Sequence, residues 1–201
     1  MKNDIRREMK LKLRAVERPV YLPLLSPVYL PVGIEAGKTP KTPETIFAYL
    51  AHGGELDPSR YIAHALELGK TIAVPRVEGP NLIFHQLVSE TGPFDTGAFG
   101  IREPRKDSPQ LFPVSEAPLR FPALLMIPGL AFTAKGARLG RGKGFYDRFL
   151  ALFLTTFADR RQDIILAGVC HSFQIVDSIP VENHDIFVDC LLTEKGCILC
   201  R

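Results

Sequence analysis

The sequence predicts an α/β protein: a mostly parallel sheet covered by helices on both faces, within a single domain spanning residues 1–201. Short apolar runs alternate along the chain with segments whose apolar residues have helical spacing, a pattern typical of parallel strands joined by helices. The length of 201 residues and the hydrophobic share of 46% suit one core of ordinary size. Pro128 and Gly129 interrupt the most apolar stretch, so no membrane-spanning segment and no membrane partner are expected.

The first segment, residues 1–18, is predicted to be a helix with a narrow apolar stripe formed by Ile5, Met9, Leu13 and Val16. It carries seven basic and three acidic side chains, so it holds the whole excess of a net charge of +3. This pattern fits a solvated amphipathic helix slightly better than a helix with a binding function. Membrane-surface binding is disfavoured because the stripe has no aromatic anchor.

Residues 19–43 are atypical because prolines recur every four residues from Pro19 to Pro31 and the tetrad PVYL appears twice. The prolines exclude a continuous helix, and an extended segment of polyproline character is expected. The acidic residues before this run, and the prolines within it, also count against a signal peptide. A cytoplasmic protein is therefore expected.

After residue 43 the pattern becomes regular. Strands are predicted near residues 46–50, 71–74, 82–86, 124–127, 164–169 and 190–193. Helices are predicted near residues 58–68 and 145–157. This alternation is what favours the parallel sheet.

The cysteines and histidines show no catalytic or metal-binding pattern. Cys197 and Cys200 form a lone C-x-x-C without the second pair that a structural zinc site needs, and we interpret them as apolar residues of a terminal strand. The five histidines have neither metal-ligand spacing nor a partnered nucleophile. No hydrolase triad is predicted.

Residues 127–150, IPGLAFTAKGARLGRGKGFYDRFL, are the most informative stretch. Seven residues within it combine three basic side chains with three glycines, namely Arg138, Gly140, Arg141, Gly142, Lys143 and Gly144. Glycines let backbone amides approach a ligand, basic groups neutralise phosphate, and the nearby Asp147 can hold an accompanying metal. A loop between a strand and a helix lies where open α/β sheets bind ligands, so we predict a nucleotide-phosphate site.

Two named phosphate motifs are absent from this loop. Ala137 and Gly144 stand where a Walker A motif needs glycine and Ser or Thr, and Phe145 stands where the dinucleotide fingerprint needs its third glycine. A solvated basic loop is the alternative interpretation. The small net charge gives little support for nucleic-acid binding, and no nucleic-acid partner is expected.

Within residues 127–150 the chain resembles the 5-formyltetrahydrofolate cyclo-ligases, also called 5,10-methenyltetrahydrofolate synthetases. The segments KNDIR, GGELD, GKTIAVPR, FGIREP and IPVENHDIFVD support the resemblance in the same order along the chain. The resemblance implies a ligase of one-carbon metabolism that uses ATP and Mg²⁺. It implies conversion of 5-formyltetrahydrofolate to 5,10-methenyltetrahydrofolate, ADP and phosphate through a phosphorylated formyl group. A monomer acting on small molecules is expected.

The resemblance also assigns site residues. It places at ATP Lys2 and Arg6 of the first helix and the loop residues Arg138, Leu139, Gly140, Arg141, Gly142, Lys143, Gly144, Phe145 and Tyr146, with Arg138, Arg141 and Lys143 as the catalytic cations. It places Asp147 and Asp189 at Mg²⁺, and Leu50, Glu55 and Phe145 at folate. Without the resemblance, Asp147 equally fits a carboxylate at a helix amino terminus, Asp189 a polar residue before a strand, and Glu55 an exposed loop residue.

The chain departs from the family pattern at Phe145, where tyrosine is usual, and at Pro58, where threonine is common. Neither change removes a group that the chemistry needs. The altered first segment keeps a second class of function open, a non-catalytic homologue that binds nucleotide, folate or a polyanion. The intact charges of the loop favour the enzyme. Arg76 and Glu103 receive no role from the sequence.

Overall fold

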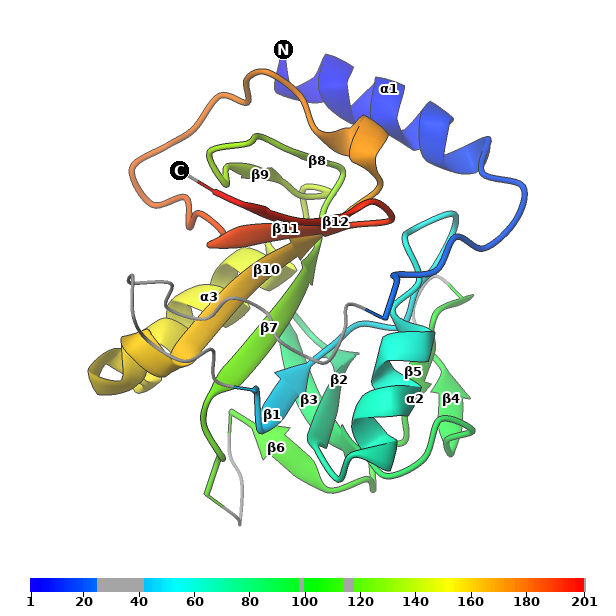
Figure 1. Cartoon of the computed structure of the whole chain (residues 1–201), viewed down its shortest axis with the longest axis vertical. Helices are drawn as coiled ribbons and strands as arrows, with labels where there is room; N and C mark the ends of the chain where they lie inside the picture. The colour runs from blue at the N-terminus through cyan, green and yellow to red at the C-terminus, as the bar shows by residue number, and fades with distance from the viewer. Residues whose placement is uncertain (25–41, 98–99, 114–117, 201) are drawn as a thin grey trace.

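The computed structural model describes residues 1–24, 42–97, 100–113 and 118–200. An eight-stranded sheet forms the centre, with strand order β12-β11-β10-β7-β1-β2-β3-β6 (Figure 1). Its strands are β1 (Thr45–Phe47), β2 (Thr71–Glu78), β3 (Asn81–Leu87), β6 (Gln110–Phe112), β7 (Ala123–Pro128), β10 (Ile164–Val169), β11 (Cys190–Thr193) and β12 (Gly196–Leu199). The five strands from β11 to β2 are mutually parallel, whereas β12, β3 and β6 pair antiparallel. The predicted, mostly parallel sheet is confirmed.

Helices cover both faces of this sheet, as predicted. Successive strand residues point to opposite sides, so a single strand contributes side chains to the core on each face. On one face, Ile46 of β1 belongs to a core cluster with Tyr61 and Ile62 of α2 (Ser59–Glu67). On the other face, Phe47 packs with Phe149 and Phe153 of α3 (Phe145–Thr156). The Phe47 and Phe153 ring centroids are 5.0 Å apart. Both layers are therefore anchored on the same short central strand.

The predicted first helix is confirmed as α1 (Lys2–Arg14). Its buried Met9 and Leu13 pack in a cluster with residues of the small hairpin formed by β8 (Ala131–Phe132) and β9 (Arg138–Leu139). After α1, Leu22 and Asp57 are joined by a backbone hydrogen bond of 2.8 Å, so residues 20–22 run extended beside the loop that precedes α2. Most of the predicted polyproline segment, residues 25–41, lies outside the described residues.

Several short elements were not predicted. They include the hairpin of β4 (Phe94–Thr96) and β5 (Arg102–Pro104), and the 3₁₀ helices η2 (Ala158–Asp163) and η3 (Ser172–Gln174). The β4–β5 hairpin explains two residues that the sequence left without a role. Arg76 of β2 pairs with Asp95 at 2.9 Å, and Glu103 accepts a hydrogen bond from the Val77 amide at 3.3 Å. Both contacts hold this hairpin against β2.

Of the two carboxyl-terminal cysteines predicted on a terminal strand, only Cys197 lies within one. Cys197 is part of the terminal strand β12, Cys200 follows it, and all four cysteines are free thiols. Across the described residues, no helix is both long and apolar enough to cross a membrane.

Candidate functional site

The glycine-rich loop connects β9 to α3 beyond the carboxyl end of β7. The Leu130 amide donates to the Leu139 carbonyl at 2.7 Å, which closes the β8–β9 hairpin and fixes the base of the loop. Gly142 and Gly144 have φ angles of 92° and 69°, a region that residues with a Cβ rarely adopt. A Cβ at Gly144 would also lie 2.7 Å from Nη1 of Arg148. The loop conformation therefore requires glycine.

The three predicted loop cations occupy different environments. The Arg138 side chain is only 6% exposed, and its guanidinium contacts the Asp147 carboxylate and, at 3.3 Å, the Pro128 carbonyl. Arg141 is exposed and pairs with Glu55 at 2.7 Å. Within the described part of the chain, the exposed Lys143 side chain has no hydrogen bond or ion pair. Arg138 is therefore fixed in place, whereas Lys143 is free to meet an incoming anion.

The structure brings one of the two predicted α1 residues directly to the loop. Arg6 Nε donates to the Gly140 carbonyl at 3.2 Å. Lys2 instead pairs at 3.0 Å with Glu182, in the segment between η3 and β11. The basic face of α1 thus adjoins the loop.

Glu55, predicted to contact folate, lies between the loop and a cavity. One carboxylate oxygen pairs with Arg141, and the other accepts the His52 amide at 3.2 Å. A cavity of about 210 Å³ separates residues 16–19 from the loop of residues 51–57, and Glu55 forms part of its wall. Leu50 is half-buried and packs on the core cluster beneath. Of the three predicted folate residues, Glu55 contacts the glycine-rich loop through Arg141 and Phe145 follows that loop at the start of α3, whereas Leu50 packs on the core.

The charge of Glu55 also affects the pKa values of two tyrosines, Tyr49 and Tyr146. Burial raises the pKa of Tyr49 well above its ordinary value, and the Glu55 carboxylate raises this pKa further. Burial likewise raises the pKa of Tyr146, with Glu55 adding to the shift and Arg138 opposing it. Both phenols remain protonated at neutral pH. Tyr49 uses its proton to bond the Leu56 carbonyl, which shapes the end of the 51–57 loop.

The two predicted metal ligands lie in different surroundings. Asp147 is 63% exposed in the first turn of α3, and only one of its oxygens contacts Arg138. Both oxygens of Asp189 are engaged, one with Arg161 at 2.7 Å and the other with the Leu166 amide at 2.8 Å. No hydrogen bond or ion pair joins these two aspartates within the described residues. The role of Asp189 as a metal ligand stays a prediction.

The described residues hold no cluster of three side chains able to bind a metal ion alone. Mg²⁺ bound with a nucleotide needs only one or two carboxylates, because phosphate oxygens and water complete its shell. The exposed Asp147 fits this requirement. Asp189 fits it less readily, because each of its oxygens already accepts a hydrogen bond.

These contacts predict that Asp189→Asn lowers stability even in the absence of metal. The amide should keep one acceptor but lose the charge that pairs with Arg161, at a cost of about 1 kcal/mol for this half-exposed group. Denaturant unfolding measures the change. A higher Mg²⁺ requirement with unchanged unfolding would instead show that Asp189 binds the metal.

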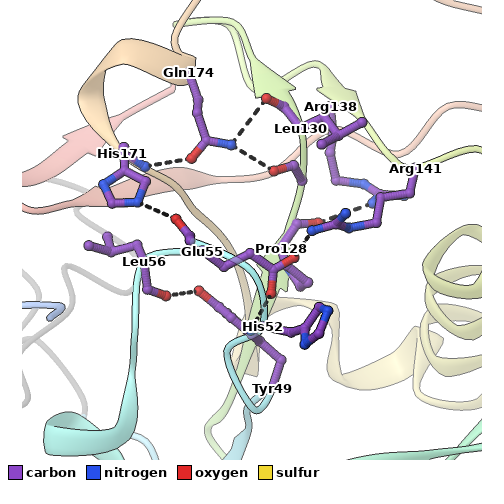
Figure 2. Close-up of polar contacts among 12 residues, drawn as sticks. Tyr49, His52, Glu55, Leu56, Pro128, Leu130, Arg138, Arg141, His171 and Gln174 are labelled. Carbon is purple, nitrogen blue, oxygen red and sulfur yellow. Dashed lines mark hydrogen bonds and ion pairs between the residues drawn. The ribbon is translucent and has the colours of Figure 1, made fainter. Parts of the chain in front are cut away.

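Two buried residues that the sequence did not single out connect the site loops (Figure 2). His171 Nε2 contacts the Gly54 carbonyl at 2.8 Å. Gln174 contacts the Gly129 and Leu130 carbonyls at 2.9 and 3.1 Å. No residue spacing could have revealed them, because their partners lie 44 to 117 positions away.

The chain matches the 5-formyltetrahydrofolate cyclo-ligase family over residues 1–194. It is 31% identical over 160 residues to a 5-formyltetrahydrofolate cyclo-ligase of Mycolicibacterium smegmatis, covering 77% of this chain and 76% of that protein. It is 30% identical over 155 residues to a probable 5-formyltetrahydrofolate cyclo-ligase of Caenorhabditis elegans, covering 75% and 73%.

Solved structures agree with this match. The 5,10-methenyltetrahydrofolate synthetase of Aquifex aeolicus aligns with a TM-score of 0.68 at 25% identity, covering 100% of this chain and 93% of that one. The synthetase of Mycoplasma pneumoniae, at 19% identity and a TM-score of 0.58, shares the fold. The resemblance predicted from the loop residues is confirmed, and the chain belongs to the 5-formyltetrahydrofolate cyclo-ligase family.

Proposed function

We propose that this protein is an ATP- and Mg²⁺-dependent ligase that converts 5-formyltetrahydrofolate to 5,10-methenyltetrahydrofolate, ADP and phosphate. The observation that carries the proposal is the Arg141–Glu55 contact of 2.7 Å, which joins the cationic glycine-rich loop to the wall of a cavity. The loop that would bind phosphate thus adjoins a carboxylate that would bind the pterin ring. The names of the relatives support the same reaction.

The chemistry explains why a phosphoryl donor is needed. An N-formyl group is an amide, so its carbonyl carbon is a weak electrophile and its oxygen a very poor leaving group. Transfer of the γ-phosphoryl of ATP to that oxygen corrects both faults. N10 then attacks the activated carbon and phosphate departs, which closes the ring. Such transfer needs in-line positioning and charge neutralisation more than a protein nucleophile.

The loop would supply that charge neutralisation. Arg141 and Lys143 are exposed and would meet the phosphates, whereas Arg138 is held in place by Pro128 and Asp147. The backbone amides from Gly140 to Gly144 would add uncharged donors at the start of α3. Leu139, Phe145 and Tyr146 would complete the nucleotide site.

Asp147, and Asp189 if it is released from Arg161, would hold the metal. Bound Mg²⁺ would neutralise charge on the transferring phosphates. Arg138 already pairs with Asp147, which orients this carboxylate toward the loop.

Folate would bind on the other side of the Arg141–Glu55 contact. The Glu55 carboxylate can accept hydrogen bonds from the donor groups of a pterin ring, with Leu50 and Phe145 offering apolar contact. A pterin bound at Glu55 would compete with Arg141. Folate binding would then free the Arg141 guanidinium to turn toward phosphate.

An absorbance assay for methenyltetrahydrofolate, run with and without ATP and Mg²⁺, tests the proposal. We expect product only when both are present. A non-catalytic homologue would bind nucleotide or folate in a titration and yield no product. The exposed, unpaired Lys143 favours the enzyme, because a cation so placed can stabilise charge that develops during transfer.

We predict that Arg6→Ala raises the KM for ATP about fivefold and weakens its dependence on salt. The Arg6 guanidinium adjoins the loop at Gly140, and cationic contacts to a polyanion are screened by added ions. Initial rates at low and high ionic strength give the measurement.

Arg7→Ala is the matched control for Arg6→Ala. It removes the same charge from the same helix, but Arg7 is 79% exposed and, among the described residues, pairs with Asp4 alone. Equal kinetic changes in the two variants would mean that α1 acts through its overall charge and not through a specific contact of Arg6.

A further inference from the structure

His171 is a buried ring with both nitrogens engaged. Its Nε2 lies 2.8 Å from the Gly54 carbonyl, and a carbonyl oxygen only accepts, so Nε2 carries the proton. The ring also accepts a hydrogen bond from the backbone amide of Gln174, as part of a capping box of η3. The ring stacks on Phe173 with centroids 5.0 Å apart, and His171 is only 3% exposed. Its position and tautomer are thereby fixed.

Gln174 is buried to the same degree, at 2% exposed, and all of its amide groups are used. Its Oε1 accepts the His171 backbone amide at 2.8 Å. Its Nε2 donates to two carbonyls, those of Gly129 and Leu130. Since both of these partners are acceptors, the orientation of the side-chain amide is unambiguous.

The His171 side chain ends on the 51–57 loop, and the Gln174 side chain ends on the β7–β8 connection at the base of the glycine-rich loop (Figure 2). Gly54 directly precedes Glu55 on the folate side. Leu130 bonds Leu139 at the base of the glycine-rich loop on the nucleotide side. The Arg141–Glu55 ion pair is a second contact between the two loops. Arg141 is 47% exposed, however, and both partners would face the substrates. Substrates would displace that ion pair and leave the buried link intact.

We propose that His171 and Gln174 are positioning residues, a buried bridge that sets the separation and orientation of the 51–57 loop relative to the glycine-rich loop. This rests on the proposed function, which places folate on the first loop and ATP on the second. Each loop binds its own substrate without the bridge. The bridge aligns the formyl oxygen with the γ-phosphoryl group, and misplacement by about 1 Å can slow such a step about a hundredfold.

Three variants test the bridge. Gln174→Glu keeps the acceptor for the His171 amide but turns an oxygen toward the Gly129 and Leu130 carbonyls. His171→Phe keeps the ring and its stack on Phe173 while removing the bond to Gly54. His171→Gln restores a side-chain donor there, so it serves as the rescue variant.

His85→Phe is the matched control. His85 is 2% exposed on β3, next to the edge strand β6, and its ring bonds the Ser108 carbonyl at 2.8 Å and neither of the two loops. His85 therefore matches His171 in burial and in the length of its ring hydrogen bond, but only His171 bonds a loop of the proposed site. The loss of melting temperature in His85→Phe measures what removal of a buried histidine costs by itself.

We expect kcat to fall at least tenfold in Gln174→Glu and His171→Phe, while each KM changes less than about threefold. His171→Gln should recover most of the lost kcat, and His85→Phe should lower only the melting temperature. Unchanged kcat in both bridge variants, or a change confined to the KM of the substrate whose loop was touched, would overturn the bridge.

Hydrogen exchange separates failure of the bridge from failure of the proposed function and needs no substrate. His171→Phe should speed exchange in residues 138–146, and Gln174→Glu should speed it in residues 51–57, so each acts on the loop that it does not contact. No such crossed effect in either variant would overturn the bridge. If the wild-type protein forms no product, yet the two variants show the crossed effect, only the proposed reaction is refuted.

Discussion

Lys143→Ala is expected to lower kcat/KM for ATP about 10²- to 10³-fold with little change in stability. Removing one group that stabilises charge in a transition state commonly has an effect of this size. Lys143 is exposed and has no side-chain partner among the described residues, so its loss leaves neither a cavity nor an unpaired buried group. Steady-state rates at limiting ATP, together with an unfolding curve, measure the two effects.

Lys135→Ala is the appropriate control for Lys143→Ala. Lys135 is also an exposed lysine, and it lies in the turn between β8 and β9, so the change in net charge is the same. We expect this variant to keep wild-type kinetics. If Lys143→Ala behaved like Lys135→Ala, the glycine-rich loop would not cradle the phosphates.

Elements with a strong local pattern could be predicted from the sequence. The strand expected at residues 164–169 coincides with β10, and the one at 190–193 coincides with β11, because both are continuous apolar runs that the sheet buries on both faces. The strand expected at 46–50 ends at Phe47 instead. Beyond it, Tyr49 bonds the Leu56 carbonyl and the chain enters the 51–57 loop, which is a tertiary effect.

The candidate site divides in the same way. The glycine-rich loop could be recognised because its charges, glycines and Asp147 lie within ten residues of one another. The Arg6–Gly140 contact and the Arg141–Glu55 pair join positions 134 and 86 residues apart, and only the resemblance indicated Arg6 and Glu55 as site residues. His171 and Gln174 had neither signal. Their role comes from carbonyl acceptors, which no side-chain pattern records.

The geometry of the loop also depends on Arg148, which lies one turn into α3. Its guanidinium donates to the Pro80 carbonyl and, at 3.0 Å, to the Lys143 carbonyl. It thus ties the loop to the β2–β3 turn. Gly144 leaves the room that this guanidinium occupies, since a Cβ there would approach Nη1 to 2.7 Å.

Gly144→Ala is therefore expected to raise the KM for ATP about tenfold or more. The new Cβ has to displace Arg148, which releases the Lys143 carbonyl and changes the direction of the loop amides. The left-handed φ of 69° adds backbone strain of about 1 kcal/mol. Gly69→Ala isolates that strain, because Gly69 has a φ of 70° in the turn after α2 and its Cβ would meet nothing within 4 Å. Both variants should lose similar stability in denaturant unfolding, and only Gly144→Ala should lose affinity for ATP. Equal KM values in the two would mean that Arg148 does not shape the nucleotide site.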